Sequence, residues 1–308
     1  MNDIAQPFIA PRFIERFGSF EKVISAVLVK ATNDVQQAER SMLAIEQSPC
    51  PVIHRFGPGI YIREVFMPAG TLAIGHEQRY EQMNVFLKGR VTMLGKNGEN
   101  VDLVAPMAFV GPPGRKIGYI AEDMVWQNIY ATEETDIEKL EAMFLVKDDV
   151  WSEDLAQRQG RTDQKSQADR EDYLLLLNEF GITHERARAE SEFEGDRVPF
   201  PYGAYKVMVT QSTIEGRGMF ATADIEPGER IAPARISGKR TPAGRYVNHS
   251  ASPNAEFVLL PNGDLDLVAL EKIKGNQGGR TESEITIDYR QALKLRELPC
   301  QQLSAPQQ

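Results

Sequence analysis

The chain has 308 residues, a length that accommodates about two domains. It is 42% hydrophobic and 26% charged, which is the composition of a soluble globular protein. A formal net charge of -9 at pH 7 argues against general binding to nucleic acids or to anionic membranes. We therefore expect no nucleic-acid or membrane partner, and an acidic surface of this kind favours basic peptides or proteins.

Only two cysteines occur, Cys50 and Cys300, far apart in the chain. They provide neither a disulfide framework nor a cysteine-rich zinc site, which suits a reducing compartment. Asp3, Glu15 and Arg16 interrupt the N-terminal stretch, which lacks the apolar core of a signal peptide. Because no apolar run reaches the length that spans a bilayer, we expect a cytoplasmic protein.

The first 150 residues predict helix followed by short strands. Apolar residues at helical spacing, Ile24, Val27 and Leu28, predict a helix, and Met42–Ile45 forms a second apolar cluster. Between Pro51 and about Lys147 the expected strands are Ile60–Phe66, Asn84–Leu87, Val91–Leu94 and Met107–Val110, the middle two joined in a hairpin through Lys88-Gly89-Arg90. Short strands at this spacing indicate a small β-barrel or sandwich.

The run Gly70…His76…Gly89, followed by Pro113-Gly114, resembles a cupin. Cupin enzymes hold a metal with two histidines and a carboxylate in a first motif and a histidine in a second. The resemblance therefore implies a cupin-like β-barrel over residues 51–147.

The metal ligands of that family are largely replaced in this sequence. His76 matches the first position, but Gln78 and Gln82 occupy the next two and Ile117 falls near the last. Glu81 lies one residue out of register, and neutral amides are poor ligands for transition metals. The segment resembles a cupin that has lost its metal, so we expect none. Small-ligand binding, homodimerisation and a role as a folding or docking module all stay open.

Residues 148–199 are polar and charged and predict a helical connector. Its apolar residues fall at i, i+3, i+4 and i+7 of an amphipathic helix: Tyr173, Leu176, Leu177 and Phe180. Gly181 is a candidate C-cap and Thr183 a candidate start of the next helix.

A polar stretch from Arg245 to Asn254, containing Asn248-His249-Ser250, lies between two apolar strands. Burying such a cluster is costly unless its donors and acceptors find partners. Either other backbone packs around it or a polar ligand docks on it. A simple polar turn and an Asn-x-Ser glycosylation acceptor are the alternatives.

Ordered blocks surround this stretch: Gly216–Ala221, Asp224–Glu229, Asp264–Ala269 and Glu284–Tyr289. In this order they resemble the SET domain of S-adenosylmethionine (SAM)-dependent protein lysine methyltransferases. The resemblance spans about Tyr205 to Leu293, just under a third of the chain. Strands are expected at Tyr205–Thr210 and Gly218–Thr222. A hairpin is expected at Ala255–Leu260 and Leu265–Leu270, since Asn262-Gly263 favours a type I′ turn.

The resemblance implies roles for particular residues. Tyr289 matches the tyrosine whose hydroxyl lies at the methyl-transfer pore and orients the amine. The cofactor SAM is expected against Gly216, Arg217, Gly218, Met219, Arg245, Tyr246, Asn248 and His249. The family also threads its Asn-His-Ser segment through a loop near the tyrosine as a pseudoknot, an exception to unknotted topology.

Three departures affect the substrate groove rather than the cofactor pocket. Only about 14 residues separate Ile231 from Arg245, so the insert that usually helps form the groove is nearly absent. No cysteine cluster follows the domain, and Asn276–Thr281 is an extra glycine-rich loop. Histone specificity therefore does not follow.

The sequence predicts a mainly β protein with helical segments, in which a cupin-like barrel is joined by a helical connector to a SET-type fold with a pseudoknot. The expected divisions are 1–50 helical arm, 51–147 cupin-like barrel, 148–199 connector, 200–294 SET domain and 295–308 tail. The function hypothesis is a SAM-dependent protein-lysine N-methyltransferase acting on a non-histone protein. The alternatives are a non-catalytic assembly protein built on relic domains and a metal enzyme using His76 and Glu81.

Overall fold

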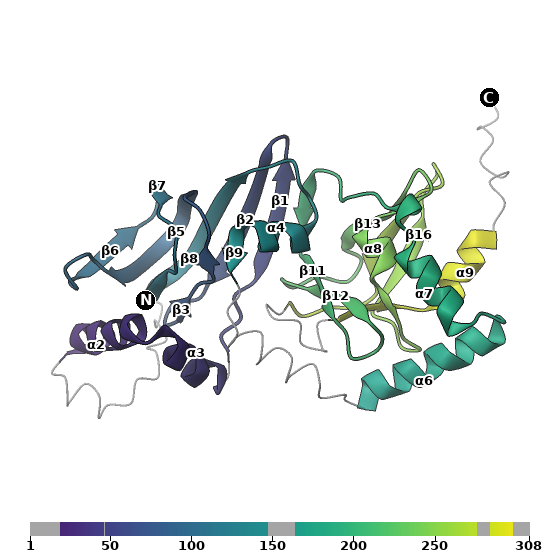
Figure 1. Ribbon diagram of the computed structural model, residues 1–308, viewed down its shortest axis with the longest axis horizontal. Helices are drawn as coiled ribbons and strands as arrows, with labels where there is room; N and C mark the ends of the chain where they lie inside the picture. The colour runs from purple at the N-terminus through teal and green to yellow at the C-terminus, as the bar shows by residue number, and fades with distance from the viewer. Residues whose placement is uncertain (1–18, 46, 147–163, 276–283, 298–308) are drawn as a thin grey trace. The chain divides into compact units, whose positions relative to one another are not determined.

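A computed structural model (Figure 1) describes residues 19–45, 47–146, 164–275 and 284–297. Within these ranges the chain is mainly β with helical segments, as predicted. The glycine-rich loop 276–281, the tail beyond 297 and Cys300 lie outside the described residues.

The chain divides into two compact units. Unit 1 comprises 1–52, 59–132 and 140–154, and unit 2 comprises 53–58, 133–139 and 155–308. The helices of the predicted connector therefore belong to unit 2. No described helix is long and apolar enough to cross a membrane.

Unit 1 is built on an antiparallel sheet. Its strands are β2 (Ile60–Met67), β3 (Leu72–Ile74), β5 (Gln82–Leu94), β6 (Asn100–Val104), β7 (Met107–Gly111) and β8 (Ile117–Ala131), in the order β2-β8-β5-β6, with β3 on β8 and β7 on β5. Two short strands, β4 (Glu77–Gln78) and β9 (Leu145–Val146), pair separately. Alternation along β2 buries Val65 and Met67 in a core with Phe86 of β5 and Met124 of β8.

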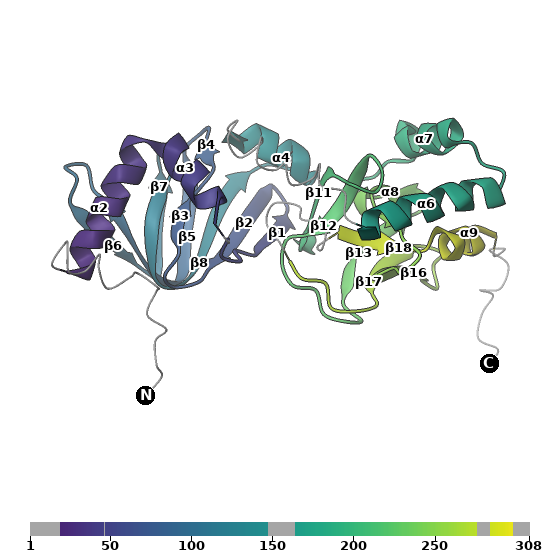
Figure 2. The same cartoon turned by 90° about the horizontal axis from the view of Figure 1, so that it is seen from below.

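The predicted N-terminal helix is confirmed as α2 (Phe20–Asn33), which is followed by α3 (Val35–Leu43). The side chain of Ser19 accepts from the backbone N–H of Lys22 and caps α2. Ile24 and Leu28 pack against Tyr119 of β8, so the helix covers part of the unit 1 sheet (Figure 2). A further helix, α4, spans Ile137–Phe144.

The predicted hairpin at Lys88-Gly89-Arg90 is wrong, because Gln82–Leu94 is one continuous strand. Gly89 has φ +91°, and its position in the ladder with β8 is a bulge rather than a reversal. A Cβ on Gly89 would lie 2.3 Å from the carbonyl oxygen of Asp123. The glycine therefore admits a close backbone approach within the sheet, a need that resembles a turn when only the sequence is known.

Unit 2 contains two four-stranded sheets. The first has the order β11-β12-β18-β15, with bounds Val207–Gln211, Arg217–Ala221, Glu284–Ile287 and Asn248–His249. The second has the order β14-β13-β17-β16, with bounds Lys239–Arg240, Arg230–Ile236, Leu265–Ala269 and Ala255–Leu259. In addition, β1 (Val52–Gly57) pairs with β10 (Gly203–Tyr205).

The strand expected over Tyr205–Thr210 is divided at Lys206, where the chain passes from β10 to β11. The hairpin of β16 and β17 is confirmed, but it is closed by a longer loop than a two-residue turn. The N–H of Leu260 bonds the carbonyl of Asp264, and Gly263 takes the left-handed conformation at φ +86°.

Among the described residues of unit 2, the helices are α6 (Gln164–Glu179), α7 (His184–Glu192), the 3₁₀ turn η1 (Glu194–Asp196), α8 (Pro242–Arg245) and α9 (Tyr289–Glu297). The predicted amphipathic helix is α6, which buries Leu176 and Leu177. Gly181 is left-handed at φ +60°, and Thr183 caps α7 by accepting from the N–H of Arg186. Helices α6 and α9 lie side by side (Figure 2), joined by an ion pair from Arg290 to Glu179.

Candidate functional site

Strand β18 joins two of the predicted blocks, Gly216–Ala221 and Glu284–Tyr289, to the polar stretch that contains Asn248. On one side it pairs antiparallel with β12, where Met219 lies opposite Ile285. On the other side it pairs in parallel with β15, where Asn248 lies opposite Thr286. Tyr289 follows directly as the first residue of α9. Segments separated by up to 70 residues in the sequence therefore meet along one strand.

The amide of Asn248 is held by acceptors from two of these segments. Its Nδ2 donates to Glu284 Oε1 at 2.8 Å and to the carbonyl oxygens of Glu215 at 3.1 Å and Arg217 at 3.4 Å. Asn248 is 8% exposed, so these bonds satisfy a donor that would be costly to bury alone. They also tie β15 to the Gly216-Arg217-Gly218 segment.

Glu284 is a buried carboxyl, 4% exposed, at the start of β18. Ser212 Oγ lies 2.8 Å from Oε1 and 3.0 Å from Oε2 as a donor. Burial raises the pKa of Glu284 to about 7, with a further upward contribution from Asp169, while the hydrogen bonds from Asn248 and Ser212 lower it. The carboxyl therefore titrates near neutral pH.

Position 218 leaves no room for a side chain, because the carboxyl of Glu284 lies against Gly218. A Cβ on Gly218 would lie 2.3 Å from Glu284 Oε1 and 2.9 Å from Glu284 Cδ. The sequence predicts SAM against this glycine, whereas its neighbour among the described residues is the carboxyl of Glu284. Gly216 differs, because its Cβ would meet open space and its φ is +50°.

His249 connects helix α6 to the beginning of α9. Its Nδ1 accepts the backbone N–H of Tyr289 at 3.1 Å, so the ring proton lies on Nε2 and is donated to Asp172 Oδ2 at 2.8 Å. Arg290 binds both oxygens of Asp172, at 2.9 and 3.3 Å. The hydrogen bonds from Arg290 and then His249 lower the pKa of Asp172, which is therefore ionised at neutral pH.

Two neighbouring polar residues complete the enclosure of β18. Ser250 donates from its N–H to the carbonyl of Ile287 at 3.0 Å and from Oγ to Asp169 Oδ1 at 2.6 Å. The amide of Asn254 bonds the carbonyl of Glu284 and the N–H of Thr286, at 2.8 and 2.9 Å. The polar stretch noted in the sequence is thus buried because protein groups satisfy it.

The hydroxyl of Tyr289 donates to the carbonyl oxygen of Val247 at 2.9 Å. Burial, with a smaller contribution from Tyr173, raises the pKa of the phenol well above its usual range. The rings of Tyr173 and His249 lie 6.1 and 5.3 Å from that of Tyr289, centroid to centroid. Tyr289 is therefore a neutral hydrogen-bond donor in an aromatic setting.

The remaining predicted residues have structural partners of their own. The guanidinium of Arg245 binds the carbonyl oxygens of Ser191 and Phe193 at the end of α7. Arg217 lies 4.7 Å above the ring of Tyr246 and forms an ion pair with Glu138. The structure thus gathers Gly218, Asn248, His249 and Tyr289, together with fully buried Met219, around β18. The side chains of Arg217, Arg245 and Tyr246 make other contacts, although the carbonyl of Arg217 accepts from Asn248.

Sequence reasoning missed the polar face of α6, formed by Ser166, Asp169 and Asp172. Ser166 accepts from Thr213 Oγ1 at 2.8 Å, and the two carboxylates receive Ser250 and His249. Their spacing of three residues is a helical stripe continuous with Leu176. The stripe is visible in the sequence, but a buried helix face is normally recognised by apolar residues, and this one is polar.

Of the residues that match the cupin metal positions of unit 1, Gln78 and Gln82 are buried. Gln78 Oε1 accepts from Tyr130 at 2.7 Å, and Gln82 is 4% exposed with no hydrogen-bond partner for its amide among the described residues. His76 is partly exposed and Glu81 is exposed. Over the described ranges, no group of three His, Cys, Asp or Glu side chains is placed to hold a metal ion.

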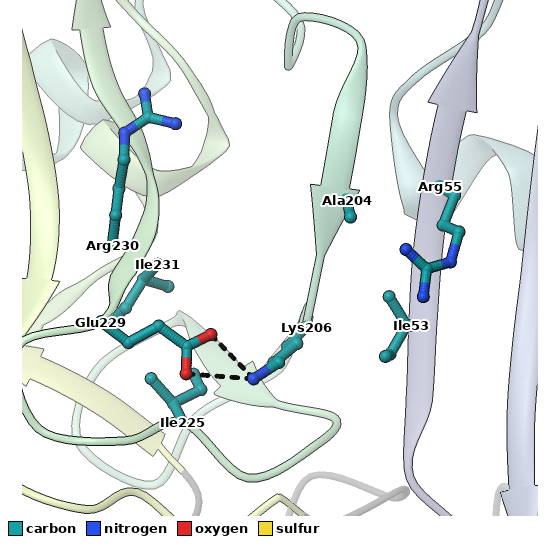
Figure 3. Close-up of a pocket in the computed structure, with 8 residues that line it drawn as sticks. All are labelled: Ile53, Arg55, Ala204, Lys206, Ile225, Glu229, Arg230 and Ile231. Atoms are coloured by element: carbon teal, nitrogen blue, oxygen red, sulfur yellow. Dashed lines mark hydrogen bonds and ion pairs between the residues drawn. The ribbon is translucent and has the colours of Figure 1, made fainter.

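A separate cavity of about 260 Å³ lies in unit 2 (Figure 3). Among its charged side chains, Lys206 binds Glu229 at 2.7 Å, and Arg230 binds Asp266 at 2.6 Å. The lining comprises Ile53, Arg55, Ala204, Lys206, Ile225, Glu229, Arg230 and Ile231. None of these is a predicted site residue, and the cavity presents no arrangement of nucleophile and base.

No family model matches the chain, and no curated protein matches it. Similar solved structures include cupin proteins. A protein from Neisseria meningitidis is 9% identical, with a TM-score of 0.24 over 30% of this chain and 96% of its own. An RmlC-like cupin from Methanocaldococcus jannaschii is 14% identical, with a TM-score of 0.23 over 32% and 91%. A cupin-2 domain protein from Shewanella frigidimarina is 12% identical, with a TM-score of 0.23 over 32% and 99%. At these scores the likenesses assign no function to the chain.

Proposed function

We propose that the chain is a SAM-dependent protein-lysine N-methyltransferase that modifies a non-histone protein, with its SET-like site in unit 2. The observation that carries the proposal is the parallel pairing of Asn248-His249 with β18, directly before Tyr289. This arrangement joins the segments that the resemblance assigns to the cofactor and to the pore. The hydroxyl of Tyr289 bonds the carbonyl of Val247, adjacent to Asn248.

The residues present suit the positive groups of the cofactor, a sulfonium and an ammonium, which it carries beside one carboxylate. The carbonyls of Glu215 and Arg217 and the carboxyl of Glu284 converge on Asn248, and all are acceptors. Acceptors of this kind stabilise cations. When bound, SAM supplies an electrophilic methyl group. Gly216, Gly218, Asn248 and His249 are the residues that would hold it.

Tyr289 acts in this proposal by orientation rather than by proton abstraction. Its raised pKa keeps the phenol protonated, so the hydroxyl does not act as a base. Its one proton is donated to Val247, which leaves the hydroxyl oxygen to accept from an N–H of the amine. An apolar channel favours the neutral form of the substrate lysine, since desolvation disfavours ammonium. Holding that amine in line accounts for much of the acceleration in a transfer of this kind. The carbonyl of Val247 fixes the hydroxyl direction.

The test is transfer of radiolabelled methyl groups from SAM to proteins of a lysate. Tyr289→Phe removes the hydroxyl and keeps the ring, and a loss of transfer of tenfold or more is expected. Tyr202→Phe is the matched control, because Tyr202 lies outside these segments. Its hydroxyl donates to a carboxylate oxygen of Glu133 at 2.5 Å. Equal transfer by wild type and Tyr289→Phe would remove Tyr289 from the mechanism.

A second candidate is a non-catalytic assembly protein in which both units are scaffolds. The observation that favours it is the short path from β13 through β14 to α8, which leaves no insert to form a substrate groove. In unit 1, the amides of Gln78 and Gln82 stand where cupin enzymes bear ligands. In this reading a cupin-like unit 1 serves as a docking or pairing module, and intact protein binds no SAM.

A further inference from the structure

Two carboxyls lie buried in this site, Glu284 beside Asn248 and Asp169 beside Ser250. Each is 4% exposed, and the described residues provide neither with an ion pair. The partners of Glu284 are neutral, namely the amide of Asn248 and the hydroxyl of Ser212. Burying a carboxylate without a countercharge is costly, so this pair requires an explanation.

Asp169 has fewer partners than Glu284, because only one of its two carboxyl oxygens accepts a hydrogen bond from the described residues. Its Oδ1 accepts from Ser250 Oγ at 2.6 Å, whereas Oδ2 is buried and has no hydrogen-bond partner among the described residues. Buried acceptors are rarely left unpaired, and an unpaired one marks a place for a water, an ion or a ligand group. Asp169 comes from α6, a helix outside the blocks that resemble a SET domain.

Glu284 is also placed directly against the glycine segment. The carboxyl touches the position that a Gly218 Cβ would occupy. Through Asn248 Nδ2 it shares a donor with the carbonyls of Glu215 and Arg217. Negative charge and carbonyl dipoles therefore converge on the segment that the proposed function assigns to the cofactor.

We propose that Glu284, supported by Asp169 of α6, is the countercharge for the positive charge of the bound cofactor. The inference rests on the proposed function and deepens it, because it assigns a binding role to one residue of the last strand and one of the connector helix. Glu284 ionises when the cofactor binds and releases its proton to solvent. SAM binding is thereby coupled to pH.

The charged groups that face Glu284 define the expected pH range. Asp169 raises its pKa, and Lys165 of α6, which is exposed, lowers it, while the phenol of Tyr289 stays neutral. With a pKa of about 7, Glu284 is almost wholly protonated at pH 5.5 and about half ionised at pH 7. The α-amino group of the cofactor titrates at about 7.7–8.0 and stays charged throughout this range.

The experiment is calorimetric titration of the full chain with SAM at pH 5.5 and 7.0, each in two buffers of different ionisation enthalpy. Affinity is expected to rise about tenfold with pH, and the buffer dependence of the enthalpy should show proton release. Glu284→Gln should abolish both effects. Glu256→Gln, which removes a partly exposed carboxyl in the same unit, should retain both. The wild-type buffer comparison alone tests the inference if Glu284→Gln does not fold.

S-adenosylhomocysteine keeps the ammonium charge and lacks the sulfonium. A comparison with SAM therefore shows which positive group of the cofactor lies at Glu284. The same pH dependence with this ligand places the ammonium at Glu284, and a weaker dependence places the sulfonium there. SAM binding without pH dependence or proton release would overturn the inference and leave the proposed function standing. Failure of the folded protein to bind SAM at all would overturn both.

Discussion

Asp172 on α6 accepts a hydrogen bond from the imidazole of His249, with 2.8 Å between Oδ2 and Nε2. The opposite ring nitrogen accepts the N–H of Tyr289. A carboxylate 77 residues before His249 and 117 residues before Tyr289 therefore fixes the tautomer of His249 and, through it, the first turn of α9. This connection makes the predicted connector helix a structural part of the site.

Replacing Asp172 tests that connection. Asp172→Ala leaves the Nε2 proton of fully buried His249 without its acceptor, and a loss of about 1–3 kcal/mol in the free energy of unfolding is expected. Asp172→Asn keeps an acceptor oxygen and should lose less. Chemical denaturation of both variants measures the difference.

Glu179→Ala is the matched control, because Glu179 lies on the same helix and binds the same Arg290 without contacting His249. Its side chain is 53% exposed, and a change of less than about 1 kcal/mol is expected. An equal loss in Glu179→Ala and Asp172→Ala would show that the ion pair with Arg290, rather than the imidazole, is what matters.

Gly218→Ala should displace Glu284. The added Cβ would meet the Glu284 carboxyl at 2.3 Å, so the carboxyl must shift, and a loss of stability of about 1–3 kcal/mol is expected. Gly216→Ala is the contrasting variant, since its Cβ meets open space and the cost is only that of φ +50°, about 1 kcal/mol.

The double variant Gly218→Ala/Glu284→Ala separates this clash from other effects. Removing the Glu284 side chain removes the atom that the new Cβ meets, so the double variant should be less destabilised than the two single changes added together. Strict additivity in thermal unfolding would mean that the two residues do not touch.

Glu284 should also make stability depend on pH. Its pKa rises from 4.5 to about 7 on folding, so the folded state holds the proton more tightly. The contribution of Glu284 to the free energy of unfolding is therefore complete below about pH 4.5 and is lost as pH rises through about 7. It amounts to a change on the order of 3 kcal/mol in all. Relative to wild type, Glu284→Gln should gain stability between pH 5 and pH 8.

Urea unfolding at several pH values measures this difference. The Glu256→Gln variant should follow the wild-type curve, because Glu256 is not fully buried. A constant difference between Glu284→Gln and wild type across the range would show that Glu284 keeps an ordinary pKa in the folded protein.

Local features of the fold were predictable from the sequence. The Thr183 cap and the left-handed Gly181 depend on neighbours only a few residues away. The alternation along β2 and the spacing of Ile24 and Leu28 were likewise readable as a buried strand and a helix face.

Features that depend on distant partners were not predictable. Gly89 is a bulge only because the carbonyl of Asp123 approaches it, and a tight turn requires the same residue type. Asp169 and Asp172 have the composition of a solvated helix face, and their buried partners, Ser250 and His249, lie about 80 residues away. Ser250 and His249 come within hydrogen-bond distance of these two carboxyls only in the folded protein.

The most direct test of the proposed methyltransferase is calorimetric titration of the intact protein with SAM, beside an Asn248→Ala/His249→Ala variant. The proposal predicts micromolar binding by the wild type and its loss in a variant that still unfolds cooperatively. Absence of binding by folded wild-type protein would contradict it and leave the scaffold candidate as the better account of unit 2.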